Sequence, residues 1–236
     1  MKNIIIIINH NNETYQAQSY FAINFASCLA KKNKKILIFS TILSPKYFDE
    51  IKTKTSINKE IKTIVPFELY LYQKNLDILI FGYDTNQNLK IKSIDEVLRL
   101  LKKQINLIND KYEYIVIDFK NQWSSLDDYF IKDQETTFIN FLEYKTNTKF
   151  EILNNFNNFK TRYNVNILKY PFVISNYDGF NKDCLHLYND LKTQYKINQL
   201  FYFNESFDQP INFIRHKPWS RNSIILDTLI EKNFNN

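Results

Sequence analysis

The chain has 236 residues, of which 44% are hydrophobic, and it carries a formal net charge of +6 with two cysteines and three histidines. The cysteines are too few for a disulfide framework or a structural zinc site, and the histidines lack metal-ligand spacing. No run approaches the roughly eighteen apolar residues of a membrane span, so we expect a cytoplasmic protein. The modest positive charge is compatible with nucleic acid or acidic partners, and equally with an ordinary lysine-rich surface. We predict a single domain over residues 1–236.

The first forty residues predict a strand, a loop, a helix and a second strand. Residues 1–8 (MKNIIIII) are apolar and β-branched enough for a strand buried on both faces. Residues 9–18 (NHNNETYQAQ) have loop chemistry, and residues 19–32 (SYFAINFASCLAKK) place apolar side chains at helical spacing before two lysines. Residues 35–40 (KILIFS) are the second buried strand. In such a βαβ unit the first loop opens at the carboxyl edge of the sheet, where ligands of α/β proteins bind.

The rest of the chain continues this alternation. Further strands are predicted at residues 61–65, 76–81, 112–119, 136–142, 166–175 and 199–203. Helices are predicted at residues 67–73, 93–109, 145–163, 182–195 and in the tail 217–232. The order predicts an α/β fold with a mostly parallel, roughly eight-stranded twisted sheet and helices on both faces.

Several of these segments carry the patterns of a known family. Residues 19–30 (SYFAINFASCLA) are similar to a helix pattern TTxAxNLAxxLA, and residues 112–119 (YEYIVIDF) to a Walker B strand of the form yDyIiiDtp. Residues 75–79 (NLDIL) and 166–178 match two further strands in order. The chain therefore resembles the ParA/MinD family of deviant P-loop ATPases, of the SIMIBI class. The resemblance implies a P-loop NTPase-like, Rossmann-like three-layer sandwich; the alternative is a Rossmann-like protein without ATPase ancestry.

The chain departs from this family in the loop that would hold phosphates. Ser19 keeps the hydroxyl that the resemblance implies for magnesium binding, but the Walker lysine falls on Gln18 and the signature lysine on Glu13. The loop glycines fall on Thr14, Tyr15 and Ala17. Glycines let successive N–H groups converge on an anion, and lysine neutralises the phosphate charge. A carboxylate about 4 Å from a phosphate costs on the order of 4 kcal/mol, so we expect no tight triphosphate binding and no cofactor.

Three other positions bear on the chemistry. The family aspartate that is implied to position the attacking water falls on Ser40. Asp118 ends the Walker B-like strand, which places it beside Ser19 at the sheet edge; the alternative is a turn residue that ends the strand. Asn176 falls on the family asparagine that hydrogen-bonds adenine, and is equally compatible with a turn. We therefore expect no hydrolysis of ATP or GTP.

Two functional hypotheses follow from different classes. The first is a ParA/MinD-like pseudo-ATPase, a non-catalytic binding, scaffolding or positioning protein for plasmid or chromosome partition or for a cell-envelope machine such as cellulose synthesis or secretion. The alternative is an active ATPase with a non-standard phosphate site, in which Ser19 and Asp118 hold magnesium. Because Glu13 replaces the lysine that reaches across the family's nucleotide-driven dimer, we expect protein partners and a monomer or a nucleotide-independent dimer.

Basic residues gather before the last predicted helix. Arg215, Lys217 and Arg221 lie close to the aromatic Trp219 in the sequence. Such a cluster predicts weak, non-specific and salt-sensitive DNA binding, or contact with an acidic partner. The alternative is a solvated basic turn.

Overall fold

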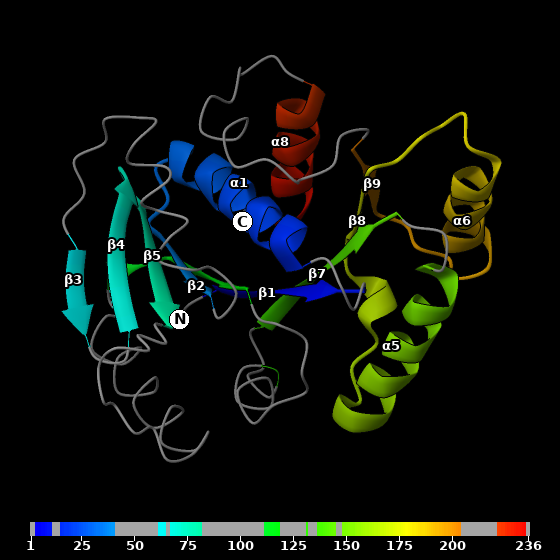
Figure 1. Ribbon diagram of the computed structural model, residues 1–236, viewed down its shortest axis with the longest axis horizontal. Coiled ribbons are helices and arrows are strands. Elements are labelled where there is room, and N and C mark those ends of the chain that lie inside the picture. Colours follow the sequence, from blue (N-terminus) through cyan, green and yellow to red (C-terminus); the bar gives the residue numbers. More distant parts are fainter. Residues whose placement is uncertain are drawn as a thin grey trace.

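Nine strands form one sheet in the part of the chain that the structure describes (Figure 1). The computed structural model describes residues 3–10, 15–40, 61–64, 67–81, 111–118, 131, 136–144, 148–203 and 221–234. The strand order is β3-β4-β5-β2-β6-β1-β7-β8-β9. The bounds are β1 Asn3–Asn9, β2 Ile36–Ser40, β3 Ile61–Ile64, β4 Phe67–Gln73, β5 Leu76–Phe81, β6 Tyr114–Asp118, β7 Thr136–Glu143, β8 Phe172–Ser175 and β9 Leu200–Tyr202.

The sheet is parallel apart from one edge. β3 pairs with β4, and β4 with β5, in antiparallel fashion, and all the other neighbours are parallel. The prediction of a mostly parallel α/β sheet is confirmed, with nine strands in the described residues where roughly eight were expected.

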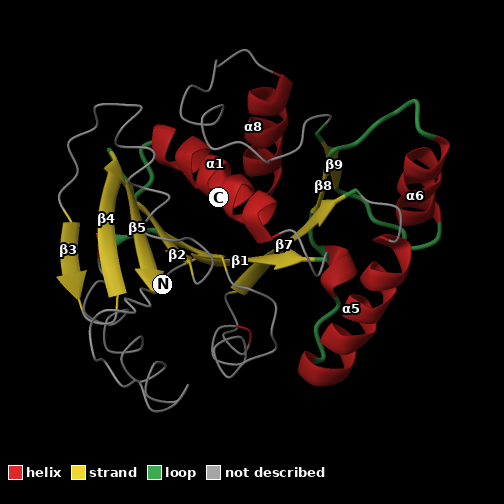
Figure 2. Cartoon of the chain, in the orientation of Figure 1, coloured by secondary structure: helices red, strands yellow, loops and turns green. Residues whose placement is uncertain are grey.

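Helices cover both faces of the sheet, as predicted (Figure 2). The described helices are α1 Tyr15–Lys31, α5 Thr148–Tyr163, α6 Lys182–Thr193 and α8 Arg221–Asn233, with a short 3₁₀ turn, η2, at Ile167–Lys169. Side chains of α1 and α8 belong to one apolar core, and side chains of α5 and α6 belong to a second core on the opposite face. None of these helices is both long and apolar enough to cross a membrane, within the residues that the structure describes.

The isoleucine run of β1 explains why this strand lies in the centre of the sheet. Ile5 and Ile7 pack into the core under α1 and α8, whereas Ile6 and Ile8 pack into the core under α5. Successive side chains of a strand point to opposite faces, so only a continuous apolar run can serve two cores. Each buried isoleucine contributes about 1.5–3 kcal/mol relative to exposure, so β1 has no stable position at a solvated edge.

One predicted helix and the start of one predicted strand are wrong. Residues 67–73 form strand β4 and not a helix, because the alternation of leucine and tyrosine has a period of two and a two-residue turn at Asn75 (φ 66°) returns the chain along β5. The strand expected at 166–175 begins only at Phe172, since Asn166 caps η2 and Pro171 cannot donate to a ladder. The helix predicted at 93–109 lies outside the described residues.

Helix α1 begins at Tyr15, one turn earlier than the expected start at residue 19. No glycine interrupts residues 14–17, and glutamine and alanine are good helix formers, so nothing favours a non-helical backbone there. The Gln16 amide donates to the Tyr20 hydroxyl at 2.6 Å, one turn further along. Residues that the resemblance aligns with a phosphate-binding loop therefore form the first turn of a helix.

Helix α8 is fixed to α1 and to the sheet. Lys32, just after α1, forms ion pairs with Asp227 at 3.8 Å and with Glu231 at 3.4 Å. The Tyr114 hydroxyl of β6 donates to the Phe234 carbonyl at 2.8 Å. The acidic side of α8 thus faces α1, which leaves its other side toward β9.

Candidate functional site

The carboxyl ends of three adjacent strands carry the candidate site. In the register of the sheet, Asp118 of β6 is aligned with Ile7 of β1 on one side and with Ser40 of β2 on the other. Ser19 reaches the same point from α1. Carboxyl edges of parallel strands are where α/β proteins place their ligands, so this is the position at which the sequence predicts chemistry.

A closed hydrogen-bond cluster occupies this edge. The Ser19 hydroxyl donates to Oδ2 of Asp118 at 2.6 Å, and the Ser40 hydroxyl donates to the same oxygen at 2.8 Å. The three residues are 1%, 0% and 0% exposed, respectively for Ser19, Ser40 and Asp118. The predicted proximity of Ser19 and Asp118 is therefore present. Ser40 was missed as a partner; its position at the end of a strand adjacent to β6 is the signal that identifies it.

Burial dominates the electrostatics of Asp118. Loss of solvent raises the pKa of its carboxyl to about 6, and hydrogen bonds from Ser19, Ser40 and Gln18 oppose the rise. Its second oxygen, Oδ1, is buried and has no hydrogen-bond partner among the described residues. A buried carboxylate without a cation favours its protonated form. At pH 7 the carboxyl is still mostly ionised, but it takes up a proton at a higher pH than an exposed aspartate does.

Gln18 fills the position that the resemblance gives to the Walker lysine. Its side chain is 0% exposed, and Nε2 donates to the carbonyl oxygen of Ile7 at 3.3 Å. This contact turns the amide toward the end of β1. A neutral amide held against the sheet cannot supply the cation that neutralises β and γ phosphates.

The arrangement does not fit a hydrated magnesium ion. Mg²⁺ takes oxygen ligands but keeps several of its waters, and here the Ser19 and Asp118 oxygens bond directly to each other in a fully buried cluster. The described residues contain no group of three or more His, Cys, Asp and Glu side chains that could hold a metal. Ser19 and Asp118, the predicted ligands, are hydrogen-bonded to each other.

Two of the remaining predicted residues, Asn176 and Arg221, are described and do not join this cluster. Asn176 follows β8, is exposed, and has a left-handed backbone (φ 56°), a conformation that asparagine tolerates in turns. Arg221 is the first residue of α8, and its guanidinium lies 5.5 Å from the centre of the Tyr202 ring. Glu13, Arg215 and Lys217 lie outside the described residues.

A second buried polar pair lies beside the site and was not predicted. His10, directly after β1, donates from Nε2 to Oδ1 of Asn140 at 3.0 Å. The amide of Asn140 donates in turn to the Ile167 carbonyl at 2.9 Å. The imidazole stacks on Phe172 and meets Phe156 edge-on, with ring centres at 5.1 Å and 5.3 Å. Burial lowers the pKa of His10 to about 4, against a smaller opposing effect of the Asn140 bond, so the ring is neutral at pH 7.

Solved structures share this arrangement of strands and helices over nearly the whole chain. The MinD cell division protein from Aquifex aeolicus aligns over 98% of this chain and 96% of its own, with a TM-score of 0.62 and 13% identity. A ParA family ATPase from Chlorobium tepidum TLS aligns over 98% and 99%, with a TM-score of 0.60 and 12% identity. The chain has the MinD/ParA fold. A plasmid partition protein from Borrelia burgdorferi aligns over 98% and 99% with a TM-score of 0.60 and 22% identity.

Comparisons with protein families and with curated proteins add no further relatives of this chain. A scan against models of protein families gave no match, and neither did a search of curated proteins. Within this fold, the segments that resemble the Walker A helix and the Walker B strand are brought together at one sheet edge through Ser19 and Asp118. The prediction of a P-loop NTPase-like three-layer architecture is therefore confirmed.

Proposed function

We propose that this protein is a pseudo-ATPase with the MinD/ParA fold, which binds partner proteins without a nucleotide cycle of its own. The observation that carries the proposal is the combination of a helical turn at Tyr15–Gln18 with the burial of Gln18 against the Ile7 carbonyl. Phosphate-binding loops work because their N–H groups converge on the anion from a non-helical backbone. A helix at these positions directs its N–H groups along its own axis instead.

Charge balance supports the same proposal. Phosphoryl transfer requires a cation beside the phosphates and a positioned water, and the described site offers a neutral Gln18 and a serine, Ser40, at the position of the water-orienting aspartate. Removing one such electrostatic group typically costs about 10²–10³ in rate. Loss of both, together with a carboxylate already bonded to two serines, supports a protein without turnover.

The biological role we propose is positioning or scaffolding. The structural neighbours include a plasmid partition protein, a cell division protein and a complex of MinC with MinD. By analogy of fold, this chain serves a plasmid or chromosome partition machine or a cell-envelope machine such as cellulose synthesis or secretion, as a cytoplasmic protein. Without a lysine to bridge two nucleotides, it acts as a monomer or as a dimer that forms without ATP.

Thermal unfolding with nucleotide tests the proposal. ATP with MgCl₂ at a hundred times any working dissociation constant adds about 2.7 kcal/mol to a binding protein, which shifts the melting temperature by several degrees. We expect no shift, and no ATP or GTP hydrolysis above that of a Ser19→Ala, Asp118→Asn variant, in which the asparagine preserves the volume of the buried side chain. Light scattering with and without ATP should give the same mass.

The alternative is an ATPase in which Ser19 and Asp118 hold magnesium after the cluster opens. Its specific support is the unpartnered Oδ1 of Asp118, which is an available metal ligand within the described residues. Hydrolysis by the wild type and not by the double variant, with a mass that doubles in ATP, would establish this alternative and overturn the pseudo-ATPase.

A further inference from the structure

The free edge of strand β9 is open to hydrogen bonding in the residues that the structure describes. Among the described strands, β9 ends the sheet order and pairs only with β8. The bonds to β8 use the carbonyl of Gln199 and the N–H of Phe203, so the alternate residues Leu200 and Tyr202 direct their N–H and C=O groups away from β8. An exposed row of such groups is a template for another extended chain.

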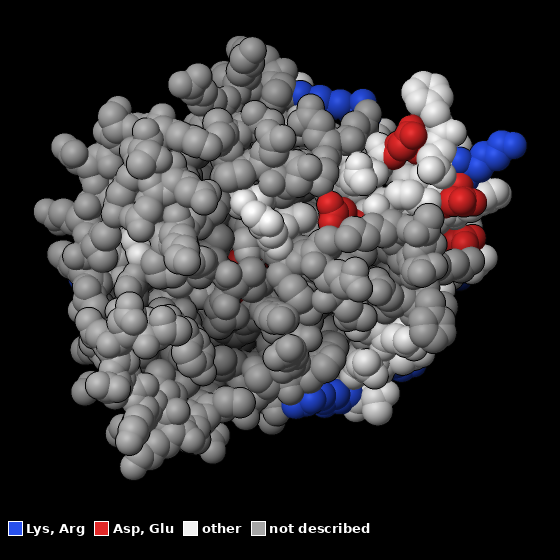
Figure 3. Space-filling view, in the orientation of Figure 1, with Lys and Arg blue, Asp and Glu red and all other residues white. Residues whose placement is uncertain are grey.

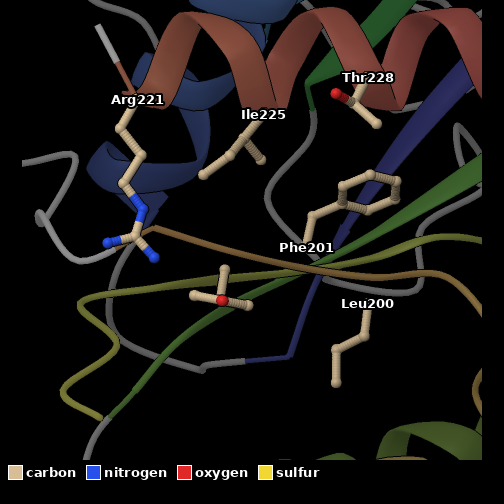
Figure 4. Close-up of a pocket in the computed structure, with 6 residues that line it drawn as sticks. Leu200, Phe201, Arg221, Ile225 and Thr228 are labelled. Carbon is tan, nitrogen blue, oxygen red and sulfur yellow. The ribbon is translucent and has the colours of Figure 1, made fainter.

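Helix α8 stands beside this edge and turns it into a groove. A cavity of about 190 Å³ is lined by Leu200, Phe201, Tyr202, Arg221, Ile225 and Thr228. In Figure 4, Arg221, Ile225 and Thr228 point from α8 toward β9, and Phe201 points from β9 toward the helix. The described lining side chains are apolar apart from Arg221, the Tyr202 phenol and Thr228, whose hydroxyl already donates to the Ile224 carbonyl of its own helix at 2.8 Å.

Among the described residues, the charge that lines the groove is positive. The acidic residues Asp227 and Glu231 of α8 pair with Lys32 on the side toward α1. Arg221 is therefore the charged side chain that α8 presents to the cavity. A cation on the first residue of a helix opposes the helix dipole, so its position is not explained by helix stability.

We propose that this groove binds an extended, acidic peptide segment of a partner protein as an added strand on β9. The segment bonds to the outward N–H and C=O groups of Leu200 and Tyr202, places an apolar side chain between Phe201 and Ile225, and sets a carboxylate against Arg221. Main-chain bonds supply affinity in this mode, and alternate side chains supply specificity. The inference takes its biological setting from the proposed partner-binding function.

A peptide fits these observations better than DNA. An apolar cavity beside an open backbone edge recognises an extended chain, whereas a duplex needs several cations along its phosphates, and Arg221 is the one cation among the described residues that line the cavity. On the face in Figure 3, basic and acidic side chains of the described residues are interspersed around the α6 end, so the described part of that face shows no single-signed basic patch.

Titration of ¹⁵N-labelled protein with short synthetic peptides tests the proposal. The probes are capped Thr-Val-Xaa-Val-Thr-Val peptides in which Xaa is Glu, Gln or Lys. With the Glu peptide, we expect amide shifts at Leu200 and Tyr202 that exceed those at Phe201 and Phe203, whose N–H groups serve β8. The Lys peptide, and a Glu peptide with alternate N-methylated amides, should bind at least about tenfold more weakly.

Two arginine variants provide the matched control. Arg162 on α5 also lies 5.5 Å over a tyrosine ring, that of Tyr163, but away from the groove. Arg221→Glu should weaken the Glu peptide at least about tenfold and improve the Lys peptide, whereas Arg162→Glu should change neither. Glutamate suits the start of α8, so loss of folding is not expected.

Three outcomes would overturn the proposal that the groove binds an acidic peptide. The first is no amide shift at Leu200 or Tyr202 with any of the peptides, and the second is equal affinity for the Glu and Lys peptides. The third is a duplex DNA that displaces the peptide and binds more weakly to the Arg221→Glu variant. The result is separable from the nucleotide question. If the Glu peptide binds and the protein hydrolyses ATP, the groove proposal is supported and the pseudo-ATPase proposal is overturned. If the peptide does not bind and no ATP is hydrolysed, the groove proposal fails and the pseudo-ATPase proposal is supported.

Discussion

His10 should make the protein less stable as the pH falls below neutrality. Its imidazole is 0% exposed, and burial lowers its pKa from 6.5 to about 4. Because the folded-state pKa lies below the unfolded value, the unfolded chain binds more protons, and the free energy of unfolding falls as the pH decreases through this window. Between pH 7 and pH 5 these values give a loss of about 2 kcal/mol from this residue.

The measurement is urea unfolding of the wild type and a His10→Gln variant at several pH values from 7 to 4. Glutamine cannot titrate, but its amide can still donate to Oδ1 of Asn140. The variant should be less stable at pH 7, because it loses ring contacts with Phe172 and Phe156. The difference in unfolding free energy between wild type and variant should shrink by about 2 kcal/mol between pH 7 and pH 5. Only the wild type is destabilised at pH 5, because its folded state keeps the imidazole unprotonated.

Asp118 makes the comparison between the two proteins necessary. Its pKa is raised to about 6, so its effect on stability has the opposite sign and partly cancels that of His10 in the wild-type curve alone. Both proteins contain Asp118, so subtracting the unfolding free energy of the variant from that of the wild type removes its contribution. A deficit that stays constant from pH 7 to pH 4 would refute the reasoning, because it would mean that His10 takes up a proton as readily in the folded as in the unfolded state.

Three further predictions use the same unfolding assay. Asp118→Asn should gain stability relative to the wild type as the pH rises from 4 to 7, by about 2 kcal/mol, because the wild-type carboxyl must ionise in a buried site; a difference independent of pH contradicts this. Phe21→Ala should cost about 3–5 kcal/mol, since Phe21 is 0% exposed, whereas Phe180→Ala, at a residue 98% exposed, should stay within about 0.5 kcal/mol; similar losses at both sites would rule out this core. Asn140→Leu should cost about 2–4 kcal/mol by leaving His10 and the Ile167 carbonyl without their buried partner, and a neutral result would disprove that role.

Local patterns along the chain were enough to predict most of the architecture. The isoleucine run of residues 4–8 can only lie between two cores, and the helical spacing after it requires a βαβ crossover. A strand that ends in Asp118 and a helix that contains Ser19 must then meet at one sheet edge. Each of these inferences depends on the periodicity of apolar residues within one segment and on the handedness of the connection. Residues close together in the sequence determine both.

Contacts between distant segments decided the rest. Ser40 bonds to Asp118 only because β2 and β6 are adjacent in a particular register, and His10 meets Asn140 only because β1 and β7 are. Nothing local distinguishes a serine that ends a strand from one that caps a turn. Likewise, the glutamines and the alanine of residues 15–18 allow a helical turn, but only the assembled sheet supplies the Ile7 carbonyl that accepts from the buried Gln18 side chain. Such pairings add hydrogen bonds between groups far apart in the chain, and the energy of those bonds appears only when the sheet has assembled.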